Sequence, residues 1–164
     1  MLKANGIDLL VDVRTAPGSR RLPHFARAAL ATALPTQGIG YVHIPELGGL
    51  RRARSESANT GWRNLSFRGY ADYMATDAFT SSIDHLLELA DGHTAAIMCA
   101  EAVPWRCHRS LIADALLARG VEVLDIIGPG APRPHRMTPF AIVNEGRIQY
   151  PSKPDEPELS FGAT

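Results

Sequence analysis

"GIDLLVDVR" occupies residues 6–14 and decides the fold class of this chain. It is a short apolar run, rich in branched side chains, that ends at Arg14 and leads into "TAPGSR". Such a run, bounded by proline and glycine, is typical of a buried β-strand that ends in a loop. The elements around this strand therefore determine what kind of sheet it joins.

Segments with strand and helix patterns alternate along the rest of the chain. Further strands are predicted over residues 38–44, 94–99 and 121–127, and helices over 25–34, 68–90 and 111–119. "FAIVNEGRIQY" (140–150) predicts a β-hairpin that turns at Asn144–Gly146. This alternation predicts a single α/β domain over residues 1–151, with a mainly parallel sheet flanked by helices. The proline-rich, acidic tail, residues 152–164, is expected to be unstructured.

Composition excludes several classes of protein. The chain has 164 residues, 45% of them apolar, and no run near the roughly 18 apolar residues of a membrane span. The first residues lack the pattern of a secretory signal, so we expect a cytoplasmic protein with no membrane partner. Two cysteines do not make a disulfide framework, and in a reducing compartment both are expected to be thiols.

Positive charge is concentrated in the first half of the chain, although the formal net charge is zero. Nine arginines lie between Arg14 and Arg68 against two glutamates, which gives a local net charge of +7. Arginine presents a planar fork that suits phosphate and carboxylate. The segment is either a solvated basic face or an anion-binding surface, whose partner is an anionic small molecule or a nucleic acid. Aromatic residues between Trp62 and Tyr73 suit base stacking, or belong to the core.

"CAEAVPWRCHR" (99–109) holds both cysteines and is the main candidate site. Cys99 ends a predicted strand, and a helix begins close behind it, so its thiolate would face the amides of a helix N-terminus. Glu101 and His108 are candidate proton carriers. Basic and hydroxyl side chains that could bind the substrate anion are Arg14, Ser19, Arg20, Arg68, Arg106 and Arg109. The leading hypothesis is a Cys99-dependent enzyme acting on a phosphorylated or sulfur-bearing anion, without a cofactor.

Alternatives to this hypothesis remain open. Cys99 and Arg106 have six residues between them, one more than in the loop of cysteine phosphatases. Metal binding through Cys99, Cys107 and His108 is a competitor, although neighbours in a helix would point in different directions. Structural roles are also possible: Cys99 as a buried strand end, Glu101 as an arginine partner, His108 as a helix cap. The chain could equally be a nucleic-acid module that uses its arginine-rich segment, with Cys99 structural.

Five blocks together resemble a known family: "LLVDVRTAPGSRRLPHF", "GIGYVHIPELGGLR", "FRGYADYM", "MCAEAVPWRCHRSLIADAL" and "TPFA". They are similar, in this order, to the bacterial family called domain of unknown function 488, over about residues 9–151. The resemblance implies a compact α/β domain and no established reaction. It also implies that the chain begins after a strand and helix that family members usually carry ahead of "VDVR".

Overall fold

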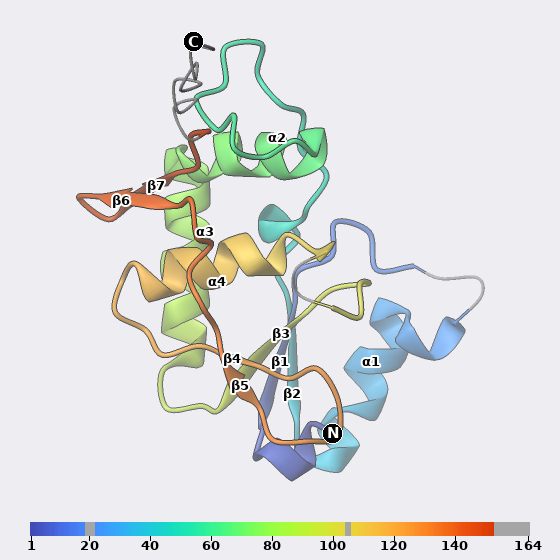
Figure 1. The fold of residues 1–164 in the computed structure, drawn as a ribbon. Helices are drawn as coiled ribbons and strands as arrows, with labels where there is room; N and C mark the ends of the chain where they lie inside the picture. Colours follow the sequence, from blue (N-terminus) through green and yellow to red (C-terminus); the bar gives the residue numbers. More distant parts are fainter. Residues whose placement is uncertain (19–21, 104–105, 153–164) are drawn as a thin grey trace, which may run out of the picture.

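Three parallel strands form the main sheet of the computed structural model, which describes residues 1–18, 22–103 and 106–152 (Figure 1). The order is β2-β1-β3, formed by β1 (Leu9–Asp12), β2 (Gly40–His43) and β3 (Ala95–Met98). All four residues of β1 are buried, as expected of a central strand with neighbours on both sides. The prediction of a buried strand within residues 6–14 is confirmed.

The described residues form four α-helices: α1 (Arg27–Ala33), α2 (Leu65–Met74), α3 (Asp77–Ala90) and α4 (Arg109–Leu117). Of these, α2 lies away from the sheet, against α3 and β7 (Figure 1). Short 3₁₀ turns occur at η1 (Lys3–Asn5), η2 (Pro23–Phe25), η3 (Pro35–Gln37) and η4 (Pro45–Leu47). Figure 1 views the sheet nearly edge-on, with α1 on one side and α3 on the other. The α/β prediction, with a parallel sheet flanked by helices, is confirmed.

Handedness explains why these helices lie on opposite faces. The chain moves from β1 to its neighbour β2 through α1, and then returns past β1 to reach β3 through α2 and α3. Because crossovers between parallel strands are right-handed, reversing the direction of travel moves the connecting helix to the other face. The reversal creates a topological switch point between β1 and β3, where ligands of such sheets usually bind.

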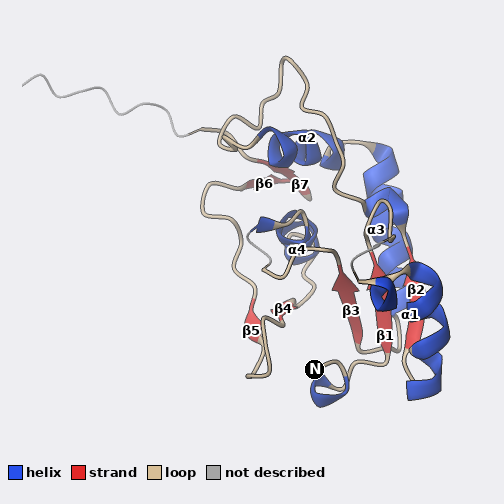
Figure 2. Cartoon of the chain, turned by 90° about the vertical axis from the view of Figure 1, so that its right-hand side faces the viewer, coloured by secondary structure: helices blue, strands red, loops and turns tan. Residues whose placement is uncertain are grey.

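The C-terminal strands form two separate antiparallel pairs. Residues 121–127, expected as one strand, contribute only β4 (Leu124–Asp125), which pairs with β5 (Arg133–Pro134) apart from the main sheet (Figure 2). Within this stretch the Asp125 carboxylate contacts Nδ1 of His135 at 3.0 Å, so this residue packs with the second strand pair rather than with the main sheet. The expectation of another long strand there was wrong.

The predicted hairpin is confirmed as β6 (Ile142–Asn144) and β7 (Arg147–Gln149). Its turn residues Glu145 and Gly146 both have positive φ angles, 48° and 76°, as a two-residue type I′ turn requires. The hairpin packs against α2 and α4 through β7 and the residue that follows it, because Ile148 and Tyr150 are buried in the same core as the helices. The tail that was expected to be unstructured lies, from residue 153 on, outside the described residues.

The hydrophobic core joins the sheet to the helices and to β7. Val11 and Leu111 are fully buried in it, together with the ring of Tyr70. Searching the described residues for a membrane-spanning segment, we find no helix that combines the required length with sufficient apolar character.

Candidate functional site

The exits of β1 and β3 lie side by side at the switch point. β1 continues to Val13, whose backbone N–H donates to the Met98 carbonyl at 2.9 Å. Cys99 follows Met98 directly, and the chain then returns through residues 100–108 to begin α4 at Arg109. The predicted cysteine loop therefore occupies the edge of the sheet where α/β proteins commonly bind ligands.

The two cysteines face each other across this loop. The structure brings the sulfurs of Cys99 and Cys107 into contact, but their Cα atoms are 7.7 Å apart, beyond the range of about 4.4–6.8 Å found in disulfides. The expectation that both are thiols in a reducing compartment stays a prediction. Each sulfur also receives a backbone N–H, from Glu101 to Cys99 at 3.2 Å and from Arg109 to Cys107 at 3.5 Å. Cys107 is buried, whereas Cys99 is only half-buried and is the more accessible of the two.

His108 completes a cluster of three donor groups. Its Nδ1 lies 3.6 Å from the Sγ of Cys107, and the sulfurs and this imidazole have donor atoms within 4.8 Å of one another. The prediction that Cys107 and His108 point in different directions was wrong, because both precede α4 and neither lies on its helical surface. His108 stands at the N-cap position of α4, yet its side chain caps no helix amide.

Burial controls the charge of His108. It lowers the pKa of this imidazole to about 4, against a smaller opposing contribution from the Val13 backbone, and nearby arginine charges reinforce the shift. The ring packs against Tyr70, with centroids 5.0 Å apart, and against Gly49. A Cβ atom on Gly49 would lie only 2.5 Å from Nδ1, so glycine is required for this approach. His108 is therefore a neutral base or ligand near pH 7.

Arg14, a predicted anion-binding residue, is held by a carboxylate. Its Nε donates to Oδ1 of buried Asp12 at 2.8 Å and its Nη2 to Oδ2 at 2.5 Å, while Tyr41 donates to the same carboxylate at 2.6 Å. Burial raises the pKa of Asp12, but the hydrogen bonds from Arg14 and Tyr41 outweigh it and leave that pKa below its ordinary value. His43 Nε2 lies 2.8 Å from the Arg14 carbonyl. Most of the donor capacity of Arg14 is directed into the protein.

Arg109 and Glu101 lie beside the cysteines. Nη2 of Arg109 donates to the Glu101 carbonyl at 2.5 Å, and its buried Nε has no hydrogen-bond partner among the described residues. Within those residues the Glu101 carboxylate forms no ion pair and remains exposed. Arg106, in the same loop, is exposed. The roles predicted for these three residues stay predictions.

Arg68, a further predicted anion-binding residue, lies outside the cysteine loop. Arg68 lies on α2 and donates to the Trp62 carbonyl from Nε and Nη2, at 3.1 and 2.9 Å. Ser19 and Arg20 lie outside the described residues, so their predicted role stays a prediction. Arg51 was not predicted as a site residue, although its position just after the Gly48–Gly49 pair is a signal that could have identified it.

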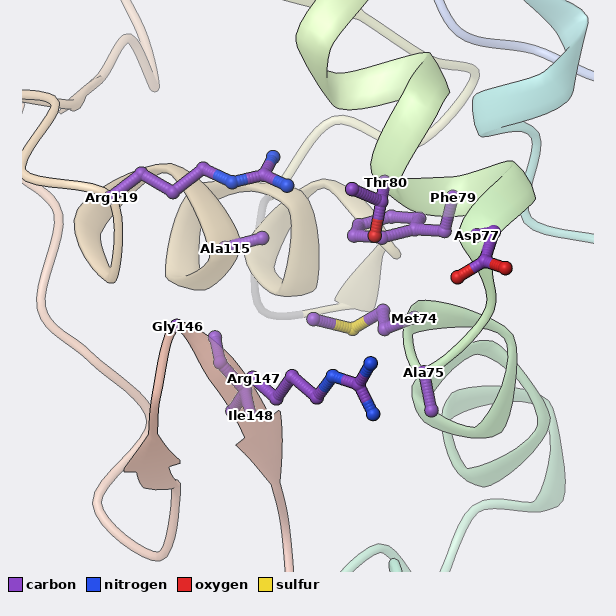
Figure 3. A pocket seen from close by; sticks show the side chains of 10 residues that line it. All are labelled: Met74, Ala75, Asp77, Phe79, Thr80, Ala115, Arg119, Gly146, Arg147 and Ile148. Atoms are coloured by element: carbon purple, nitrogen blue, oxygen red, sulfur yellow. The ribbon is translucent and has the colours of Figure 1, made fainter.

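A cavity elsewhere in the chain is too small to be the substrate site. It lies between the end of α2, the start of α3, α4 and the hairpin, and Arg119 and Arg147 extend toward it (Figure 3). Its volume is about 40 Å³, which holds water but no substrate.

Comparison with known families now identifies the family of this chain. The family model described as domain of unknown function DUF488 matches residues 1–116. The chain belongs to the DUF488 family. This match contains the whole 99–109 loop and ends at Leu116, short of the range to residue 151 that the sequence blocks predict, so β4–β7 lie beyond it. No curated protein and no solved structure matches this DUF488 chain.

Proposed function

We propose that this chain is a cysteine-dependent enzyme that acts on an anionic substrate, with Cys99 as the nucleophile of its reduced form. The observation that carries the proposal is the half-buried Sγ of Cys99 at the switch point, which accepts the N–H of Glu101. An N–H directed at sulfur favours thiolate over thiol, and thiolate is the reactive form. The nearby charges of Arg106 and Arg109 favour an anion beside it.

The first chemical step is the same for a phosphorylated and a sulfur-bearing substrate. A lone pair of the Cys99 thiolate attacks the electrophilic phosphorus or sulfur, and the bond to the leaving group breaks with its electron pair. Exposed Glu101, when protonated, supplies the proton that the leaving group takes up. The substrate fragment is then covalently attached to Cys99.

Cys107 gives the sulfur-bearing substrate a second step. Nδ1 of His108 lies 3.6 Å from the Cys107 sulfur and orients that thiol, which loses its proton to solvent. The Cys107 thiolate then attacks the Sγ of Cys99, forming the Cys99–Cys107 disulfide and expelling the substrate thiolate. A dithiol reductant returns both cysteines to the reduced form. The contact between the two sulfurs supports this sequence.

The pH dependence of alkylation tests the nucleophile. Iodoacetamide reacts with a single cysteine in the reduced Cys107→Ser variant, and the reduced Cys99→Ser variant serves as the matched control. We expect Cys99 to react with an apparent pKa below the ordinary value of about 8.5. An apparent pKa at or above that value in Cys107→Ser contradicts the nucleophilic role.

A second candidate function is metal binding, favoured by the convergence of Cys99, Cys107 and His108. Two thiolates and one neutral imidazole suit zinc or iron, and three protein ligands leave a coordination position open for a substrate. Nδ1 of His108 lies 3.6 Å from the Cys107 sulfur, so it is the ring nitrogen placed to be the ligand atom. Metal bound to the reduced chain at a 1:1 ratio, with both thiols protected from iodoacetamide until a chelator is added, supports this function. A metal-free chain with reactive Cys99 supports the enzyme.

A further inference from the structure

An open hollow lies between the loop that follows β2 and the start of α2. Its volume is about 510 Å³. Residues 51–55, Leu65, Ser66 and Arg68 line it. Four guanidinium groups thus line one surface, although the whole chain has no net charge.

Neutral acceptors hold two of these arginines in place. Arg51 donates to the carbonyls of Gly48 at 3.2 Å and Glu46 at 2.5 Å, and its guanidinium lies 3.7 Å from the centre of the Tyr73 ring. Arg68 donates to the Trp62 carbonyl. Carbonyl oxygens and an aromatic ring orient a guanidinium without cancelling its charge. This contrasts with Arg14, whose charge is neutralised by Asp12.

The other two arginines extend from an ordered loop. Arg52 and Arg54 are exposed, and within the described parts of the chain neither side chain forms an ion pair. Buried Asp72 fixes the loop beneath them: it accepts the Arg54 N–H at 2.8 Å, the Ser57 hydroxyl at 2.5 Å and the Asn59 amide at 2.8 Å. The exposed guanidinium groups of Arg52 and Arg54 are therefore carried by a fixed backbone.

We propose that this hollow binds the phosphate backbone of double-stranded nucleic acid without reading its sequence. The open shape does not enclose a small ligand, which binding pockets usually bury over most of its surface. The aromatic rings near the hollow are engaged elsewhere: Trp62 packs on Phe67, Phe140 and Tyr150, and Tyr70 is fully buried. No stacking platform for unpaired bases remains among them, so contacts to phosphates carry the binding.

The backbone amides at the start of α2 are not available to bind a phosphate. Oδ1 of Asn64 already accepts the N–H groups of Ser66 and Phe67, at 2.8 and 3.4 Å. The arginine charges are therefore the source of attraction, and the binding must depend on ionic strength.

Fluorescence anisotropy of a labelled 20-base-pair DNA duplex tests the proposal on the full chain. Four phosphate contacts predict a slope of log K against log salt of about −3.6, which weakens binding about 150-fold between 50 and 200 mM salt. The variant Arg52→Glu/Arg54→Glu is expected to bind at least about tenfold more weakly with a slope closer to zero by about 2. Arg133→Glu/Arg136→Glu changes the charge equally at exposed positions away from the hollow and is expected to bind like the wild type.

Several results would overturn this inference. They are absence of binding to duplex DNA and duplex RNA at 50 mM salt, equal losses in the two double variants, and tighter binding of a single strand than of a duplex. Displacement of the duplex by pyrophosphate at equal phosphate concentration would also contradict it, because it would indicate a small phosphorylated ligand. Circular dichroism of both variants confirms that a loss of binding does not reflect unfolding.

Discussion

The Sγ of Cys107 lies 3.6 Å from Nδ1 of His108, its neighbour in the chain. Two consecutive residues of a helix cannot direct their side chains to one point. They meet here because α4 begins only at Arg109. Cys99 approaches the same point from the end of β3, so the cluster depends on where one helix starts.

Gly49 is the residue whose size controls the position of His108. In Gly49→Ala, the new Cβ would lie 2.5 Å from Nδ1 and 2.9 Å from Cγ of the imidazole, so the ring has to move. We expect the free energy of unfolding to fall by about 1–3 kcal/mol, measured by urea denaturation. Gly130→Ala, where a Cβ would meet open space, is the control and should change it by less than about 0.5 kcal/mol. If Gly49→Ala left the free energy of unfolding unchanged, the imidazole ring would be free to move.

The sheet was predictable because its strands are distinct in the sequence. "GIDLLVDVR" and "TAAIMC" are apolar runs bounded by turn residues, and burial of β1 on both faces follows from that pattern. Residues 121–127 are on average as apolar as these two runs, so the sequence pattern does not distinguish them. Only tertiary packing places Asp125 against His135 and outside the parallel sheet. Local pattern alone does not contain that contact.

The members of the candidate site were predictable from the sequence, whereas the partners of its charged side chains were not. Cys99, Cys107 and His108 stand within ten residues of each other, so their loop was recognisable. Arg14 was predicted to be free for an anion, because charge composition does not reveal that buried Asp12 lies opposite it. Partners of buried charges are set by the folded core.

The stability of the protein should fall even when Arg14 is replaced by a residue of the same charge. In Arg14→Lys, one ammonium replaces the fork that contacts both oxygens of Asp12, so we expect a loss of about 1–3 kcal/mol of stability. Exposed Arg27→Lys on α1 should be neutral. A double-mutant cycle with Asp12→Asn measures the coupling, which we expect to exceed about 1 kcal/mol. A coupling near zero would mean that the pair contributes nothing and that Arg14 is available to a ligand.

Asp72 should keep the loop of the arginine hollow resistant to proteolysis. Asp72→Asn replaces one acceptor oxygen with a donor amide that faces the donors of Arg54, Ser57 and Asn59. We expect the free energy of unfolding to fall by about 1–3 kcal/mol. We also expect faster trypsin cleavage after Arg52 or Arg54, which mass spectrometry measures. Asp91→Asn, at an exposed position, is the control. Equal cleavage rates in the two variants would refute the role of Asp72.

The contacts of His135 should make the stability of the protein fall above neutral pH. Nε2 of this ring lies 3.2 Å from buried Asp114 and Nδ1 lies 3.0 Å from Asp125, so both nitrogens donate only when the ring is protonated. The contact with Asp114, reinforced by Asp125, outweighs burial and raises the pKa of His135 above 6.5. Its stabilisation is therefore complete below pH 6.5, the ordinary value, and is lost as the pH rises through the folded-state pKa.

Replacement of His135 separates this effect from the other titrating groups. In His135→Gln, urea denaturation should show lower stability at pH 6 and a smaller decline between pH 6 and pH 9 than in the wild type, because no imidazolium remains to lose its proton. His85→Gln, at an exposed position on α3, should retain the wild-type decline. If His135→Gln keeps the full decline, His135 is neutral in the folded protein, and one of its two carboxylate contacts carries no hydrogen bond.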